Sequence, residues 1–205
     1  MLENFEQKTE ISNVHFLVHP GYMVKNKTPY YSSKNMVELI QNYTLKAKTL
    51  KSDELMVLFA PVENDKKFIQ GIRKGQDIYV DIIKKIKEIL GKRLIVLGNN
   101  GEAFAENKEE VWARIKNIAE KRGFPFKKNL TAEAYGEYIN ACVAAVAMNM
   151  HSAAKMPKSK PVKIRAEITD FIVRKQKQDE LNKDKYPNTK LDFSRKLNKK
   201  TRKYI

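Results

Sequence analysis

The sequence predicts an α/β fold: a Rossmann-like three-layer sandwich with a mostly parallel sheet, followed by a basic C-terminal extension. Three short apolar runs, at residues 14–18, 55–59 and 93–97, each stop in a polar, turn-prone stretch. Segments with helical spacing separate these runs, and parallel strands need such crossovers. The three strands are therefore expected to point the same way, so that their carboxyl ends share the edge of the sheet where such folds bind ligands.

Helices are expected over residues 35–49, 78–90 and 108–122. The second is the clearest, because its isoleucines recur at helical spacing and Gly91 follows it. Residues 124–128 read as a short edge strand, although Pro125 weakens that assignment.

Thr131 is then expected to cap a long helix over residues 132–154, whose small apolar residues predict burial on most sides. Residues 162–168 alternate apolar and charged side chains, which is typical of a strand with one wet face. A helix over 169–182 and an arm from Lys183 complete the chain. The expected organisation is an α/β domain over residues 1–156 and an extension over residues 157–205.

Charge is distributed unevenly along the chain, whose net charge is +16. Residues 155–205 hold 17 lysines and arginines against 6 acidic residues, a net charge of +11, which leaves +5 for the preceding residues. Basic residues interleaved with aromatic ones are typical of single-stranded nucleic-acid binding. The sequence therefore predicts RNA or DNA as a partner, bound through Lys183, Lys185, Lys190, Arg195, Lys196, Lys199, Lys200, Arg202 and Lys203. The alternative is a compositional bias that places lysines on solvated faces.

The single cysteine excludes an internal disulfide and suits a reducing compartment. No basic stretch followed by an apolar one opens the chain, and no apolar run approaches the ~20 residues that span a bilayer. A cytoplasmic protein without a transmembrane segment is expected. The sequence does not indicate an oligomeric state.

The strand-end loops carry the candidate site. His19 and Glu63 are candidate catalytic residues, and a small ligand is expected to contact Gly21, Asn64, Gly98, Asn99, Asn100 and Gly101. The loop at 98–101 matches no nucleotide-binding motif, and its Asn-Gly pair also suits an ordinary turn. A solvated charged loop is likewise the simpler account of the residues around Glu63.

No metal and no other cofactor are expected. His15 and His19 lie four residues apart on a strand, about 13 Å, which is too far for both to hold one ion. His15 is expected to be a packed or capped polar residue, whereas His19 stands at a strand end.

Cys142 is the third candidate catalytic residue. Residues 136–147, with Gly136 six positions ahead of Cys142, a following valine and then alanines, resemble the cysteine segment of isochorismatase-like hydrolases. The resemblance implies a parallel α/β sheet and a cysteine nucleophile on a turn that opens a helix, assisted by an aspartate and a lysine. His19 stands where that aspartate belongs, no lysine can be assigned, and no apolar strand is expected immediately before Gly136.

The apolar neighbours of Cys142 favour a buried packing residue instead. The leading hypothesis is accordingly an α/β binding protein that associates with RNA or DNA. The alternatives are a small-molecule hydrolase of the isochorismatase-like type and a degenerate, non-catalytic relative of such an enzyme.

Overall fold

The computed structural model describes residues 8–20, 33–61, 78–99, 107–136, 142–165 and 189–192. Its strands are β1 (Ile11–Val18), β2 (Glu54–Pro61), β3 (Leu94–Asn99), β4 (Phe126–Gly136), β5 (Val162–Arg165) and β6 (Thr189–Asp192). Its helices are α2 (Ser33–Lys48), α4 (Ile78–Leu90), α5 (Lys108–Lys121) and α6 (Ala144–Ala153), and a short 3-10 turn (Gly91–Arg93) precedes β3.

The strands form one sheet in the order β3-β2-β1-β4-β5-β6, and every neighbouring pair is parallel. The predicted α/β class and the shared direction of the first three strands are therefore confirmed. The chain builds outward from β1 to β3, then returns to the centre and builds the other way from β4 to β6. The order thus reverses between β1 and β4.

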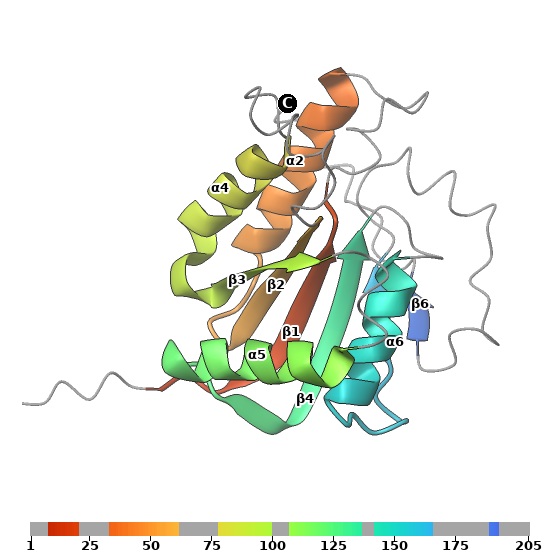
Figure 1. The fold of residues 1–205 in the computed structure, drawn as a ribbon. Coiled ribbons are helices and arrows are strands. Elements are labelled where there is room, and N and C mark those ends of the chain that lie inside the picture. Colours follow the sequence, from red (N-terminus) through yellow and green to blue (C-terminus); the bar gives the residue numbers. More distant parts are fainter. Residues whose placement is uncertain are drawn as a thin grey trace, which may run out of the picture.

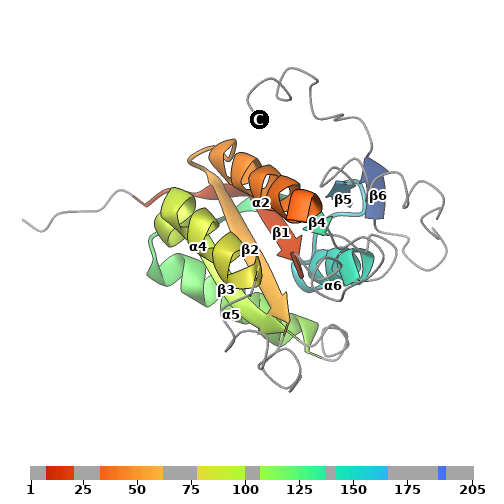
Figure 2. The same ribbon diagram turned by 90° about the horizontal axis from the view of Figure 1, so that it is seen from above.

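Helices cover both faces of the sheet (Figures 1 and 2): α2 and α4 lie on one face, and α5 and α6 lie on the other. Successive side chains of β1 point to opposite faces of the sheet, so this strand contributes to both cores: Phe16 packs on the α5–α6 side and Leu17 packs on the α2–α4 side. The α2–α4 side is closed by Tyr43 of α2 and by Ile82 and Ile86 of α4, each at most 3% exposed.

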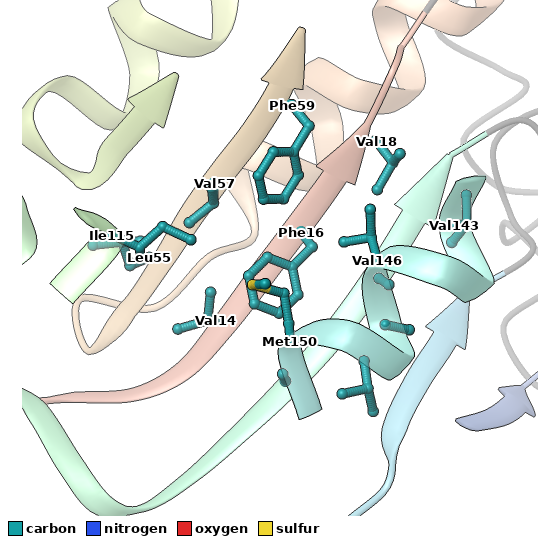
Figure 3. Packing of buried hydrophobic residues seen from close by; sticks show 14 of the residues in the cluster. Val14, Phe16, Val18, Leu55, Val57, Phe59, Ile115, Val143, Val146 and Met150 are labelled. Atoms are coloured by element: carbon teal, nitrogen blue, oxygen red, sulfur yellow. The ribbon is translucent and has the colours of Figure 1, made fainter. Parts of the chain in front are cut away.

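The core on the α5–α6 side is centred on β1 (Figure 3). Val14, Phe16 and Val18 of that strand lie among apolar side chains of β2 and α6. Val146 and Met150 of α6 are almost completely buried there. Side chains buried on both faces explain why β1 reads as a nearly continuous apolar run.

Strand β4 corrects two predictions. Residues 126–136 form an eleven-residue strand between β1 and β5, not a short edge strand, so the helix expected over 132–154 is wrong for residues 132–136, and among the described residues of that range α6 covers Ala144–Ala153. Leu130, Ala132 and Ala134 form the buried face of this strand on the α6 side, whereas the later small residues Ala144 and Ala147 are helical and buried as predicted. The expectation that no strand precedes Gly136 is wrong for the same reason.

The pairing of β1 with β4 contains an irregularity. Ile11 is opposite Phe126 and Asn13 is opposite Thr131, so β4 advances five positions while β1 advances two. The additional residues include Lys127, Lys128 and Asn129, which are exposed. This bulge lies at the amino end of the two strands and leaves their register regular from Asn13 to Val18.

The sheet continues into the C-terminal segment, since β5 pairs with β4 and β6 pairs with β5. The strand predicted over 162–168 is confirmed for residues 162–165. The helix predicted over 169–182 lies outside the described residues. In the part of the chain that the structure describes, no helix is both long and apolar enough to cross a membrane.

Candidate functional site

The candidate site lies where the strand order reverses, at the carboxyl ends of β1 and β4. Val18, the last residue of β1, is in register with Phe59 of β2 and with Gly136, the last residue of β4. In open parallel sheets the crossovers that leave two such strands go to opposite faces, which leaves a crevice beyond their ends. Here α2 and α6 cover opposite faces, as that rule requires.

His19 is the first residue after β1. Its backbone has a positive φ of 44°, which residues other than glycine seldom adopt. Its N–H donates to the carbonyl oxygen of Phe59 at 2.9 Å. The side chain is 8% exposed. This left-handed residue still bonds to the neighbouring strand, and the extended backbone of β1 ends there, at the predicted site.

Gly136 allows β1, β4 and α6 to meet closely. A Cβ atom at this position would stand 2.7 Å from the carbonyl oxygen of Val18 and would overlap the side chain of Val143. Val143 is fully buried, and it lies just ahead of α6, near Val18 and Val146 (Figure 3). A larger residue at position 136 would therefore separate the two strands that frame the site.

Cys142 adjoins this contact, because the next residue, Val143, packs against Gly136. The thiol is free and half-buried, in the π-helical residues 142–143 that lead into α6. Burial raises the pKa of Cys142 above its ordinary value of 9.0, so the sulfur is a protonated thiol at neutral pH. It lies beyond the end of β4 in a helical segment, and its protonation is that of a packing residue.

The other predicted strand-end residues lie farther away or outside the described residues. Gly98 and Asn99 end β3, which is separated from β4 by β2 and β1. Three strand spacings place β3 about 14 Å from β4. The sheet therefore places His19 and Cys142 beyond the ends of the neighbouring strands β1 and β4, and it leaves Gly98 and Asn99 two strands away from β1. Gly21, Glu63, Asn64, Asn100 and Gly101 lie outside the described residues.

Of the predicted nucleic-acid contacts, the structure describes the backbone of one. Lys190 lies in β6, opposite Lys163 of β5. The remaining eight, at positions 183, 185, 195, 196, 199, 200, 202 and 203, lie outside the described residues.

A second polar cluster, which the sequence did not identify as a site, surrounds His15 in the middle of β1. His15 is 2% exposed. Its Nδ1 lies 3.0 Å from the hydroxyl of Tyr135, and its Nε2 lies 2.9 Å from Nδ2 of Asn13 and 3.5 Å from Oε2 of Glu54. The expectation that His15 is a packed polar residue is confirmed, but the cluster around it also contains charged groups.

The cluster continues from Tyr135 to helix α2. The hydroxyl of Tyr135 donates to Oε2 of Glu133, and Nζ of Lys46 lies 3.6 Å from the same oxygen. The ammonium group also lies 4.8 Å from the centre of the Tyr135 ring, a cation–π contact. One carboxylate thus links β4 to both α2 and, through Tyr135, the imidazole of β1.

The pKa values of His15 and Glu54, the two titratable groups nearest the centre of the cluster, are both lowered. Burial lowers the pKa of His15 below its ordinary value of 6.5. The contact with His15 is the largest of the effects that lower the pKa of Glu54 to about 2, and the N–H of Lys51, 2.9 Å from Oε2, acts in the same direction. At neutral pH the imidazole is therefore neutral and Glu54 is ionised.

Neither cluster has the donor set of a metal centre. Across the residues whose positions are described, no three histidine, cysteine, aspartate or glutamate side chains gather in an arrangement that holds a metal ion.

Comparison of the sequence with models of known protein families finds no match, and comparison with curated proteins finds none either.

Proposed function

We propose that this chain is an α/β binding protein that binds a small ligand at the ends of β1 and β4 and associates with RNA or DNA through its lysine-rich C-terminal segment. The observation that carries the first part is the reversal of strand order between β1 and β4. His19, with its left-handed backbone, directly follows β1 on one side of the reversal, and Gly136 allows the segment that leads into α6 to pack closely on the other side.

The ligand proposed for this crevice is a small anion or a phosphate-bearing molecule. Val143, which directly precedes α6, packs against Gly136 at the end of β4, so the amino-terminal end of α6, where the helix dipole favours anions, lies near the same edge of the sheet. Among the described residues, the first turn of α6, which includes Ala144 and Ala145, holds no acidic side chain that would repel an anion.

Titration of ¹⁵N-labelled protein with inorganic phosphate and with adenosine monophosphate tests this part. Saturable shifts are expected for the backbone amides of His19, Gly136 and Val143, while the amide of Val96, on the exposed side of β3, serves as a control. Shifts confined to surface lysines, or shifts as large at Val96 as at Gly136, would contradict a ligand site at the reversal.

The observation that supports nucleic-acid binding is the net charge of +11 over residues 155–205. Neutralised phosphates release counterions, so the affinity for a single-stranded oligonucleotide should fall steeply as salt rises. Deletion of residues 183–205, which hold nine basic residues, should abolish most of the binding. An affinity that survives both changes would contradict this proposal. A protein that acts on nucleic acid in this way is expected in the cytoplasm.

A hydrolase of the isochorismatase-like type is the second candidate, favoured by one observation: Cys142 follows the end of β4 and precedes α6. Two features rank it below a binding protein. Burial raises the pKa of the thiol, and β1 ends in His19 rather than in an acid. A degenerate, non-catalytic relative accommodates both features. Hydrolysis of a small amide that is lost in a folded Cys142→Ala variant would establish the hydrolase instead.

A further inference from the structure

His15 is a buried titratable group in the centre of the sheet with polar partners on every element around it. Among the described residues, the titratable and charged groups that face it are Glu54 from β2, Glu133 and Tyr135 from β4, and Lys46 from α2. None of them belongs to the proposed ligand site or to the lysine-rich segment, so the cluster is unexplained by the proposed function.

We propose that His15 is a proton-operated switch that sets how tightly helix α2 is held on the sheet. The switch has two arrangements, which differ in the partner of Nε2. In the neutral arrangement, Nδ2 of Asn13 donates to Nε2, and the N–H on Nδ1 donates to the hydroxyl of Tyr135. Tyr135 in turn donates to Glu133, whose carboxylate holds Lys46 of α2.

The amide of Asn13 fixes the direction of this chain of hydrogen bonds. Its Oδ1 lies 3.0 Å from the hydroxyl of Thr131, which can donate to it, and its Nδ2 also lies 3.5 Å from Oε1 of Glu54. Because Oε1 of Glu54 beside Nδ2 can only accept and the Thr131 hydroxyl beside Oδ1 donates, the amide presents N–H groups to His15. Nε2 must then accept, which places the single imidazole proton on Nδ1.

A second proton on the imidazole breaks this arrangement. Nε2 becomes a donor that faces the N–H groups of Asn13 at 2.9 Å, and the nearest acceptor is Oε2 of Glu54 at 3.5 Å. Protonation therefore exchanges Asn13 for Glu54 as the partner of Nε2. It also places a positive charge 3.7 Å from the Glu133 oxygen that Lys46 contacts. Two cations then share the carboxylate of Glu133, so the ion pair between Lys46 and Glu133 weakens. Helix α2, which carries Lys46, is then held less tightly on the sheet.

The switch operates on the acidic side of neutrality, because burial disfavours the charged imidazole. As pH falls below 6.5, an unfolded chain takes up a proton on His15 before the folded chain does, so stability decreases. The stabilisation is complete at neutral pH and is lost progressively as pH falls toward the lower pKa of the folded state.

NMR titration of the full chain tests the switch. The imidazole signals of three histidines are assigned by elimination with His19→Gln and His151→Gln variants, so that His15 itself need not be altered. Above the transition, the ¹⁵N shifts of His15 should show a proton on Nδ1. The midpoint pH of the His15 titration should lie below 6.5. The chemical shift of the Ala47 amide, which is buried on α2 beside Lys46, should change with the same midpoint pH.

A matched pair of variants identifies the second partner of the imidazole. Glu54→Gln removes the carboxylate that accepts the hydrogen bond of the added proton on Nε2, and it should lower the midpoint pH of the His15 titration further. Glu120→Gln removes an exposed carboxylate paired with Lys116 on α5 and should leave that midpoint unchanged. A midpoint at or above 6.5, a proton on Nε2 in the neutral form, or an Ala47 amide that does not follow His15 would each overturn the proposal.

Discussion

Replacement of Gly136 by alanine tests the close contact at the strand-order reversal. The added methyl group would stand 2.7 Å from the carbonyl oxygen of Val18, 3.4 Å from its Cβ, and in overlap with Val143. The carbonyl belongs to the backbone of a central strand, so it cannot move without displacing β1. Overpacking of this kind costs about 1–3 kcal/mol of unfolding free energy. In a chain of 205 residues, a loss of ~2 kcal/mol corresponds to a Tm lower by roughly 4–8 °C.

Gly98→Ala is the matched control. Gly98 lies at the same edge of the sheet, on β3, and an added Cβ there meets nothing within 4 Å. Its unfolding free energy should therefore stay within about 0.5 kcal/mol of the wild type. Urea unfolding followed by far-UV circular dichroism and a thermal scan measure both variants under identical conditions.

A double variant separates the two contacts of the new methyl group. Val143→Ala removes the side chain that Gly136→Ala would overlap, but it leaves the Val18 carbonyl in place. The double variant should therefore lose less stability than the sum of the two single variants, yet remain less stable than Val143→Ala alone. Equal stability of Gly136→Ala and Gly98→Ala would refute the description of the reversal as a close contact between β1, β4 and α6.

Three further predictions concern burial and charge. Met150→Ala should cost about 2–5 kcal/mol in urea unfolding, because this fully buried side chain of α6 belongs to the same core as Phe16; a loss below ~1 kcal/mol would contradict that packing. Glu54, whose pKa falls from 4.5 to about 2, stabilises the fold above pH 4.5 and loses this effect as pH falls toward 2, so Glu54→Gln should flatten acid unfolding between those values. An unchanged dependence of stability on pH between 4.5 and 2 in this variant would contradict the lowered pKa of Glu54. The Cys142 thiol should react with a disulfide reagent more slowly in the folded protein than in urea, because burial raises its pKa; faster reaction when folded would indicate an activated nucleophile.

The strands β1 to β3 and helix α4 are predictable because their patterns are unambiguous. Apolar runs that end in turn residues specify buried parallel strands, and the isoleucines of α4 repeat at helical spacing. The sequence predicts a helix from residue 132, where the structure has strand β4, because the alanines on the buried face of this strand favour helices when considered alone. The competing signal was an alternation with period two: Leu130, Ala132 and Ala134 face the core, and polar residues stand between them.

The edge of the sheet that carries the candidate site was also predictable, because parallel strands share their carboxyl ends. The cluster around His15 was not. Glu54 and Glu133 lie 39 and 118 residues away in the sequence, and only the register that pairs β1 with β2 and β4 brings them to the imidazole. A histidine within an apolar run does indicate that polar partners must exist, but it does not indicate which ones.

The irregular pairing between β1 and β4 offers a place to attach a reporter. The residues that β4 gains there protrude into solvent at the amino end of the sheet, opposite the proposed ligand crevice, and register beyond them is undisturbed. A cysteine introduced at Lys128 would be exposed, whereas the native Cys142 is half-buried with a raised pKa. A fluorophore could thus be coupled selectively at position 128, remote from the chemistry it is meant to observe.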